Sequence, residues 1–320
     1  NKELSAWVKT NYPRSKSDLM ACFMEVGLST LLPNGILGMI NQHSWMFLSS
    51  YESLREELIK KIQIDTLLHL GPRTFPEIGG EVVQNAAFTL INEESNKNGN
   101  YLRLVDFDNS TLKREKTLES IKNPNCSWFY NSNQKNFSKI PGSPIGYWLS
   151  ETIVDLFSES ASIKEKVVAR QGMATGNNER FIRLWYEISH NQLNRNAHSN
   201  VEAFESRKRF FPYNKGGEFK RWFGNQLFII CFSEDDYRIL KSMGNHCPSE
   251  HLYFKPSVSW ARIGSGLTSF RFYPKGFLFD QSGHSLFIDD NENVKYLMGF
   301  LNTSVYENLT KAINPTLNLE

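Results

Sequence analysis

One short stretch of the sequence combines positive charge with aromatic rings. It runs from Arg207 to Phe223, reads RKRFFPYNKGGEFKRWF and contains one acid, Glu218. Its cations are Arg207, Lys208, Arg209, Lys215, Lys220 and Arg221, and its rings are Phe210, Phe211, Tyr213, Phe219, Trp222 and Phe223. Cations bind phosphates by releasing counterions, while flat rings stack on bases or wedge between them. A solvated basic turn between two core strands would have the same composition, so both interpretations stand here.

Further polar residues in the second half of the chain are candidates for the same chemistry. The small-residue loop from Gly172 to Asn177 exposes backbone N–H groups, and the side chains of Thr175 and Asn177 are suited to a phosphate or a base edge. A structural turn anchored by Phe181 explains that loop equally well. Arg262, Arg271 and Lys275 are further candidates for reaching DNA, although each alone fits a surface cation.

The composition is that of an ordinary globular protein. With 320 residues and 40% hydrophobic content, the chain is long enough for two domains with cores of their own. The net charge of +2 means that any affinity for nucleic acid must come from local clustering of cations. The chain has no run of eighteen apolar residues and no signal peptide, and it does not begin with Met. We therefore expect no contact with a membrane, and we expect an excised piece of a longer protein.

The cysteines indicate a reducing compartment. Four are scattered through the chain without a CxxC pair: Cys22, Cys126, Cys231 and Cys247. Reduced thiols and a cytoplasmic location fit this pattern best. His246, Cys247 and His251 lie close together, but a zinc site needs a second pair of ligands, so no metal is predicted.

Helices and strands alternate over the first ninety residues. The predicted elements are helices over 18–32 and 51–62, and strands over 36–40, 64–70 and 83–91. Ser17 is the expected N-cap of the first helix, and the apolar run 36–40 is typical of a strand buried on both faces. The pattern predicts an α/β fold, the C-terminal half of a doubly wound sheet with helix crossovers. The last two strands fit an antiparallel hairpin at the sheet edge.

After residue 122 the sequence pattern changes, and it predicts short aromatic-rich strands and many turns. The clearest strand covers 227–232, a helix follows over 234–242, and two helices broken near Asn302 end the chain. We therefore predict two domains, over 1–122 and 123–320, the second of mixed α+β structure.

Residues 15–92 resemble the later motifs of amino-methyltransferases that act on adenine in DNA. The matching residues are Asp18-Leu19 and Phe23, Leu32-Pro33-Asn34-Gly35 with the run to Ile40, His69-Leu70-Gly71, Phe75, and the strand 83–91. The resemblance implies a sheet whose last strand is antiparallel, and it implies that Phe75 stacks on an adenine flipped out of the duplex. The alternative for Phe75 is a core residue that anchors the loop. Arg73 is a neighbouring candidate for contacting the DNA backbone.

Three longer motifs extend a resemblance over nearly the whole chain. They are FSKIPGSPIGYW over 137–148, RQGMATGNNERF over 170–181 and PYNKGGEFKRWFGN over 212–225. Together they resemble the large adenine-specific methyltransferases of BREX phage-defence systems, the PglX type, and more distantly the type IIG restriction-modification enzymes. The resemblance implies that the second half is a target-recognition domain that reads double-stranded DNA. It also implies site-specific adenine-N6 methylation in phage defence.

The motifs that carry the reaction in such enzymes are absent from this sequence. They bind S-adenosylmethionine through a glycine-rich loop and hold the adenine amine with Asn-Pro-Pro-aromatic. Here Asn123-Pro124 and Asn314-Pro315 lack the second proline, and Gly264-Ser-Gly266 has no suitable βα context. The resemblance therefore implies a C-terminal portion without catalytic residues, inactive alone, whose cofactor binds elsewhere in the full-length enzyme.

Two alternatives to this function remain open. The chain also fits the methyltransferase and specificity part of a type IIG restriction enzyme. It also fits a protein-docking module that contacts other BREX components or a phage inhibitor that mimics DNA, because a basic surface attracts both.

Overall fold

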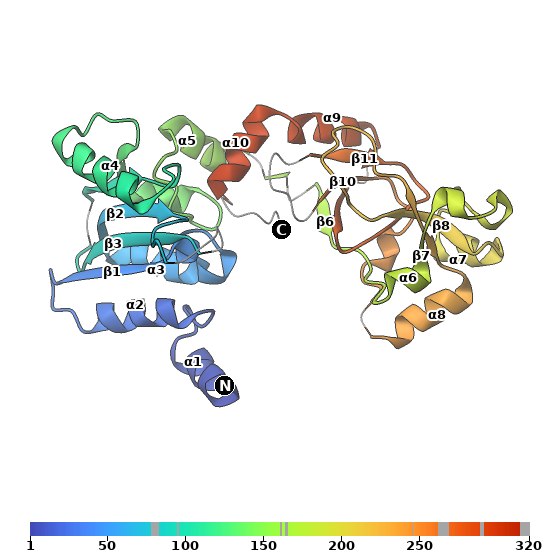
Figure 1. Ribbon diagram of the computed structural model, residues 1–320, viewed down its shortest axis with the longest axis horizontal. Helices are drawn as coiled ribbons and strands as arrows, with labels where there is room; N and C mark the ends of the chain where they lie inside the picture. The colour runs from blue at the N-terminus through green and yellow to red at the C-terminus, as the bar shows by residue number, and fades with distance from the viewer. Residues whose placement is uncertain are drawn as a thin grey trace. The chain divides into compact units, whose positions relative to one another are not determined.

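The computed structural model describes residues 1–77, 83–94, 96–160, 162–163, 166–244, 246–261, 269–288 and 291–313 (Figure 1). Apart from the last few residues of the chain, it divides into two compact units, Asn1–Ser160 and Ala161–Lys311. None of the described helices is both long and apolar enough to cross a membrane.

The first unit is built on a five-stranded mixed sheet with the order β1-β3-β2-β4-β5. Its strands are β1 (Ile36–Gln42), β2 (Gln63–Gly71), β3 (Asn85–Ile91), β4 (Asn98–Arg103) and β5 (Phe129–Asn133). Because β3 is antiparallel to both β1 and β2, those two strands run in the same direction. β4 is parallel to β2, and β5 closes the sheet antiparallel to β4.

The mixed α/β class and the antiparallel hairpin of β2 and β3 are confirmed, but the predicted place of the hairpin is wrong. β3 lies between β1 and β2 and not at the sheet edge. The reason is the connection through α3 (Glu52–Lys61), which carries the chain from β1 to a strand one position further away. The returning β3 then fills the gap and pairs on both sides.

Helices and short 3-10 turns complete the first unit. They are α1 (Lys2–Asn11), α2 (Leu19–Ser29), α3, α4 (Ser110–Lys122), α5 (Glu151–Glu159), η1 (His43–Met46), η2 (Ser49–Tyr51) and η3 (Gln134–Lys139). α3 buries Leu54 and Leu58, as its pattern predicts. Asp18, and not Ser17, is the N-cap of α2, because its carboxylate accepts the backbone N–H of Met20 at 3.0 Å.

The predicted burial of 36–40 on both faces is wrong. α2 lies alongside β1 (Figure 1), where the two elements are in contact. Yet Ile36 and Ile40 of β1 are exposed, as is Phe23 of α2. β1 is an edge of the described sheet: the side that carries Leu37 faces α2, and the opposite side, with Ile36 and Ile40, is an exposed apolar face. Sequence hydrophobicity identifies such a face but does not say which partner covers it.

Residues 123–160 belong to the first unit, so the boundary predicted at residue 122 falls inside it. β5 extends the sheet, and the buried side chain of Gln134 binds the end of α3 and the start of β2. Its amide oxygen accepts the N–H of Ile64 at 2.8 Å, and its amide nitrogen donates to the carbonyls of Ile59 and Ile62. The change of sequence pattern near residue 122 therefore does not mark the end of the unit.

The second unit contains two four-stranded sheets, ordered β11-β10-β13-β6 and β12-β8-β9-β7. The strands are β6 (Val168–Arg170), β7 (Ile182–Leu184), β8 (Phe210–Asn214), β9 (Phe228–Cys231), β10 (Ser257–Ala261), β11 (Arg271–Tyr273), β12 (Leu278–Phe279) and β13 (Gly283–Phe287). The helices are α6 (Asn178–Phe181), α7 (Asn200–Glu205), α8 (Glu234–Ser242), α9 (Asn291–Leu301) and α10 (Ser304–Ile313), with η5 (Trp185–Glu187), η6 (His190–Gln192) and η7 (Glu250–Leu252). The strand and helices predicted here by pattern are all present.

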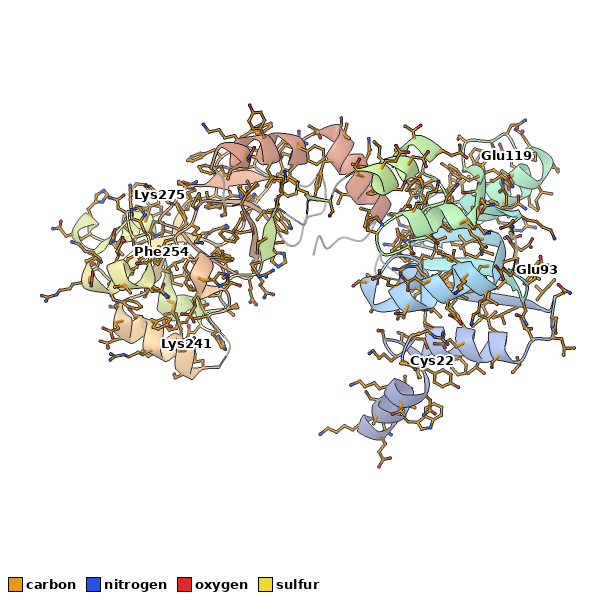
Figure 2. The ribbon with its side chains drawn as sticks, turned by 180° about the vertical axis from the view of Figure 1, so that it is seen from behind. Cys22, Glu93, Glu119, Lys241, Phe254 and Lys275 are labelled. Carbon is orange, nitrogen blue, oxygen red and sulfur yellow. The ribbon has the colours of Figure 1, made fainter. Side chains whose placement is uncertain are left out.

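Aromatic rings fill the core of the second unit. Phe254, which is labelled in Figure 2, packs edge-on against Phe211 and Phe232. Asn302 separates α9 from α10 and is buried, because its side chain bonds both backbone groups of Phe270. The predicted break between the two final helices therefore fixes them to β11.

Candidate nucleic-acid interface

The stretch from Arg207 to Phe223 divides into two halves with different environments. Its first rings, Phe210, Phe211 and Tyr213, lie in β8, where every residue is buried. They belong to the aromatic core of the second unit. For this half the structure agrees with the core-strand interpretation.

Three of the cations around β8 are bound locally. Arg209 forms an ion pair with Asp236 at 3.4 Å, and Lys208 donates to the carbonyl of Asn191 at 2.7 Å. Lys215 lies 2.7 Å from the carboxylate of Asp280, which is fully buried and also accepts the hydroxyl of Tyr213 at 2.6 Å. Arg207 is exposed at the end of α7. Two of the six cations predicted here, Arg209 and Lys215, are therefore neutralised by carboxylates within the fold.

The second half forms an exposed turn over residues 218–225, which we call the aromatic turn. Its rings are the most accessible part of the stretch: Phe219 is 55% exposed, Trp222 50% and Phe223 65%. Lys220 is exposed and has no acidic partner among the described residues, and the guanidinium of Arg221 lies 5.5 Å from the ring of Phe219. Cations and rings are thus presented together here, as the DNA-binding interpretation requires.

The loop from Gly172 to Asn177 uses its polar groups internally. Thr175 is buried and its hydroxyl bonds the amide oxygen of Asn178, while the side chain of Asn177 caps α6 by accepting the N–H of Arg180. A Cβ at Gly172 would lie 2.0 Å from the carbonyl oxygen of Phe279, so only glycine fits there. These contacts favour the structural interpretation of the loop.

The remaining cations of the second unit have contrasting surroundings. Arg271 is fully buried in β11, and among the described residues no group lies within hydrogen-bond distance and geometry of its Nε and Nη2 atoms. Its Nη1 makes one long contact of 3.5 Å, to the carbonyl of Glu218 in the aromatic turn. Lys275 is exposed in the connection from β11 to β12 (Figure 2). Arg262 and the Gly264-Ser-Gly266 segment lie outside the described residues.

In the first unit, Phe75 lies just beyond the carboxyl end of β2. Its side chain is 39% exposed and outside the hydrophobic core, which disagrees with the core-anchor alternative. The buried amine of Lys113 fixes the start of this loop, because it donates to the carbonyls of Leu70 and Pro72. Arg73, beside Phe75, forms an exposed ion pair with Asp108 at 3.4 Å. The loop therefore presents an accessible ring from an anchored base.

A buried pair of histidines lies near the same carboxyl end of β2. His43 Nδ1 lies 2.8 Å from His69 Nε2, and His69 Nδ1 lies 3.1 Å from the hydroxyl of Tyr147. Burial lowers the pKa of His43 to about 4. Burial also lowers the pKa of His69 well below its usual value, with the charges of His43, Arg103 and Lys113 acting in the same direction. Both imidazoles are therefore neutral in the folded protein at pH 7.

Because both imidazoles are neutral in the folded protein, we expect the first unit to lose stability in mild acid. Between pH 6.5 and about 4 the unfolded chain binds protons that the folded chain does not, so the free energy of unfolding falls as the pH falls. For His43 the loss between pH 7 and pH 4.5 should be about 2–3 kcal/mol. Denaturant midpoints at both pH values measure it. His43→Gln should flatten the dependence, whereas His190→Gln, at an exposed position, should not. Equal slopes for His43→Gln and the parent protein would contradict this account.

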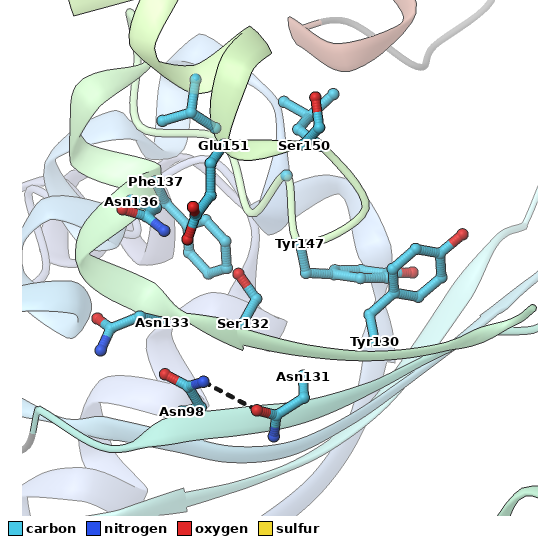
Figure 3. A pocket seen from close by; sticks show the side chains of 13 residues that line it. Asn98, Tyr130, Asn131, Ser132, Asn133, Asn136, Phe137, Tyr147, Ser150 and Glu151 are labelled. Atoms are coloured by element: carbon cyan, nitrogen blue, oxygen red, sulfur yellow. Dashed lines mark hydrogen bonds between the residues drawn. The ribbon is translucent and has the colours of Figure 1, made fainter. Parts of the chain in front are cut away.

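The first unit also contains a polar cavity of about 280 Å³ (Figure 3). It lies between β5 and the start of α5, and Asn98 at its rim donates to Asn131 at 2.8 Å. Asn98 begins β4, whereas Phe75 follows the opposite, carboxyl end of the parallel strand β2. The cavity is therefore separate from the Phe75 loop. Among the described residues, no cluster of His, Cys, Asp or Glu is placed to hold a metal ion.

Comparison with known proteins identifies the class to which this fold belongs. The family model of the Eco57I restriction-modification methylase matches residues 1–75. The type IIL restriction-modification enzyme MmeI, solved in complex with DNA, superposes with a TM-score of 0.51 at 11% identity, covering 93% of this chain and 40% of that one. The fold is thus that of the restriction-modification methyltransferases.

Two curated proteins define the relationship more narrowly. The chain is 38% identical over 328 residues to the adenine-specific methyltransferase PglX of Lacticaseibacillus casei (strain Zhang), covering all of this chain and 27% of PglX. It is 36% identical over 322 residues to the adenine-specific methyltransferase BrxX of Escherichia coli O9:H4 (strain HS), covering 99% of this chain and 25% of BrxX. Along its whole length the chain is a relative of the PglX and BrxX adenine-specific methyltransferases, and it spans about a quarter of their length.

The sequence alone did not single out several features of the site. Three features carry no local signal in the sequence: the burial of His43, the left-handed backbone of Trp222 and the burial of Arg271. Only the density of glycines around Trp222, with Gly216, Gly217 and Gly224 all at positive φ, indicates an unusual turn.

Proposed function

We propose that the chain is the C-terminal portion of a site-specific DNA adenine-N6 methyltransferase that uses S-adenosylmethionine and acts in BREX phage defence in the cytoplasm. The observation that carries the proposal is the similarity to PglX over the whole chain. In this proposal residues 1–122 and the following strand and helix complete the methyltransferase sheet, and the second unit is the target-recognition domain.

The Asn-Pro pair that the structure describes does not fit the motif that holds the adenine amine next to the methyl donor. The Asn123-Pro124 pair is a turn that ends α4, and the side chain of Asn123 accepts the N–H of Asn125 at 3.2 Å. It therefore resembles a local cap and not a site for an adenine amine. We assign the donor site to the rest of the enzyme and no step of methyl transfer to these residues.

What this chain supplies is DNA contact. Phe75 would stack on the flipped adenine, because extrusion exposes the π-face of the base and an accessible ring can hold it. Arg73 would lie beside the backbone of the same nucleotide. In the second unit Lys220 and Arg221 would contact phosphates, with Arg207, Lys208, Arg209 and Lys275 as weaker contributors, and Lys215 as a structural cation.

Charge removal from the aromatic turn tests the DNA-binding role. The double change Lys220→Gln and Arg221→Gln should lower the slope of log K against log salt by about 1.8, since each phosphate contact contributes roughly 0.9. Binding of the full-length protein to a duplex, titrated between 50 and 200 mM salt, measures the slope. Lys255→Gln, at another exposed position of the second unit, is the control.

The same titration separates the alternatives. If neither the slope nor the affinity changes in the double variant, the turn does not bind DNA, and this result favours the protein-docking alternative. Docking to a protein that does not mimic DNA would also resist competition by duplex. The type IIG alternative shares these contacts with DNA and differs only in a nuclease, so cleavage of an unmethylated duplex distinguishes it.

A further inference from the structure

The aromatic turn exposes three large rings on one short segment. Phe219, Trp222 and Phe223 are each at least half exposed, whereas the rings of β8, only a few residues earlier, are buried. Exposed apolar surface that gathers in one place commonly marks a site of interaction. The turn connects β8 to β9 and could have done so with polar residues alone.

Several hydrogen bonds hold the turn in place. The N–H of Trp222 donates to the carbonyl of Phe270 at 3.0 Å, and its own carbonyl accepts the N–H of Phe272 at 2.9 Å. The amide of Asn225 donates to the carbonyl of Glu218 at 2.8 Å and closes the turn. The backbone that carries the rings is therefore ordered before any ligand arrives, which lowers the entropy lost on binding.

The backbone of Trp222 is also in an unfavourable conformation. Its φ of 72° lies in the left-handed region, which bulky residues rarely adopt. The two bonds to the strand β11 hold it there. Strained backbone at an exposed ring is the kind of feature that accompanies function. Glycine or asparagine would occupy this position with less strain, and this contrast makes the indole a candidate for contact with a ligand.

The charges around the turn indicate what the rings meet. Lys220 and Arg221 flank them, and Arg271, buried in the neighbouring strand β11, adds a third positive charge, whose Nη1 contacts the carbonyl of Glu218. One acid, Glu218, opposes these cations within the turn. A partner with a negatively charged exterior and a flat apolar interior matches this surface, and duplex DNA has both properties.

We propose that the aromatic turn is a wedge: Trp222 and Phe223 insert between base pairs, unstack one step and bend the duplex. This inference rests on the proposed DNA recognition and adds a mechanical role to it. Lys220 and Arg221 hold the phosphates on either side of the opened step. Distortion at this step also lets the protein discriminate sequences by their stiffness, without hydrogen bonds to the bases.

The test uses the full-length protein and duplexes that carry 2-aminopurine, whose fluorescence rises when it is unstacked. The duplex ends carry a donor and an acceptor dye that report bending. Two variants remove the wedge: Phe223→Ala, and Trp222→Asn, because asparagine tolerates the left-handed backbone. Tyr186→Ala removes an equally exposed ring elsewhere in the second unit and is the control.

The parent protein and Tyr186→Ala should raise the 2-aminopurine signal and bend the duplex. Phe223→Ala and Trp222→Asn should lose both signals at saturating protein, with affinity lower by roughly 5- to 150-fold and an unchanged salt slope. If both variants distort DNA as the parent does, the wedge is overturned while DNA recognition stands. If the parent protein binds the duplex without distorting it, the wedge is likewise overturned while DNA recognition stands. No binding to duplex at low salt overturns the proposed function itself. If Trp222→Asn fails to fold, Phe223→Ala decides the question, because its side chain is mostly in solvent.

Discussion

Replacing Arg55 with methionine is expected to lower the free energy of unfolding of the first unit by about 3–5 kcal/mol. Arg55 lies in α3 and is almost fully buried, and no carboxylate of the described residues forms an ion pair with it. Its guanidinium donates to four carbonyls, those of Trp45, Leu48, Gly142 and Ser143, at 2.6–3.1 Å. Methionine keeps the packing of the stem but leaves these carbonyls without donors.

Burial also acts on the pKa of the Arg55 guanidinium. Burial lowers the pKa of the guanidinium to about 10, against the opposing influence of Glu52 and Glu56. The side chain remains charged at pH 7, and the carbonyl dipoles compensate for its lost hydration. Arg55 therefore connects α3 to the loop at 142–143, and its loss should loosen the segment that carries Tyr147.

Chemical denaturation of the first unit measures the effect. Arg55→Lys should be intermediate, because one ammonium cannot reach all four carbonyls. Arg114→Met, an exposed change on α4, should shift stability by less than about 0.5 kcal/mol. Full stability in Arg55→Lys would show that a single contact, and not the set of four, matters.

Phe75→Ala should reduce methyl transfer by the full-length enzyme about 5- to 150-fold in kcat/KM, since base–aromatic stacking is worth about 1–3 kcal/mol. Phe75→Trp should retain most of the activity, because a larger ring still offers a π-face. Incorporation of labelled methyl groups into a duplex that contains the target site measures the rate. Leu118→Ala, an exposed apolar residue of the same unit, is the control.

A mismatch opposite the target adenine gives a sharper diagnostic. A mispaired base is easier to extrude, so it should partly restore the activity of Phe75→Ala if the ring stabilises the flipped state. Activity of Phe75→Ala equal to that of the parent enzyme would refute the stacking role. A defect that the mismatch does not relieve would point instead to the shape of the loop.

The sequence predicts the local elements well but not their neighbours. Periodicity indicated α3, β9 and α8 because each has one clear apolar face or run, and the structure contains them. It did not place β3 between β1 and β2, because pairing order depends on the length and path of the α3 connection. Nor did it distinguish the buried rings of β8 from the exposed rings of the turn, since both are Phe, Tyr or Trp among cations.

The site residues also divide into those whose surroundings the sequence indicates and those whose surroundings depend on the fold. The exposure of Phe75 followed from its place in a loop rich in proline and glycine. Lys215, in contrast, looks like a free cation in the sequence, and only the fold brings Asp280 to it from 65 residues away. Ion pairs between distant segments have no local signature, so a count of cations overestimates the surface charge.

The aromatic turn is held chiefly through its main chain. The groups that fix it are the backbone atoms of Trp222, the carbonyl of Glu218, and the carbonyl of Asn225, which accepts the hydroxyl of Tyr273. Substitutions at Phe219, Lys220 or Phe223 therefore leave the framework intact while altering what it displays. The side chains at these positions can therefore change, and the DNA sequence preference with them, while the backbone of the turn and the fold stay the same.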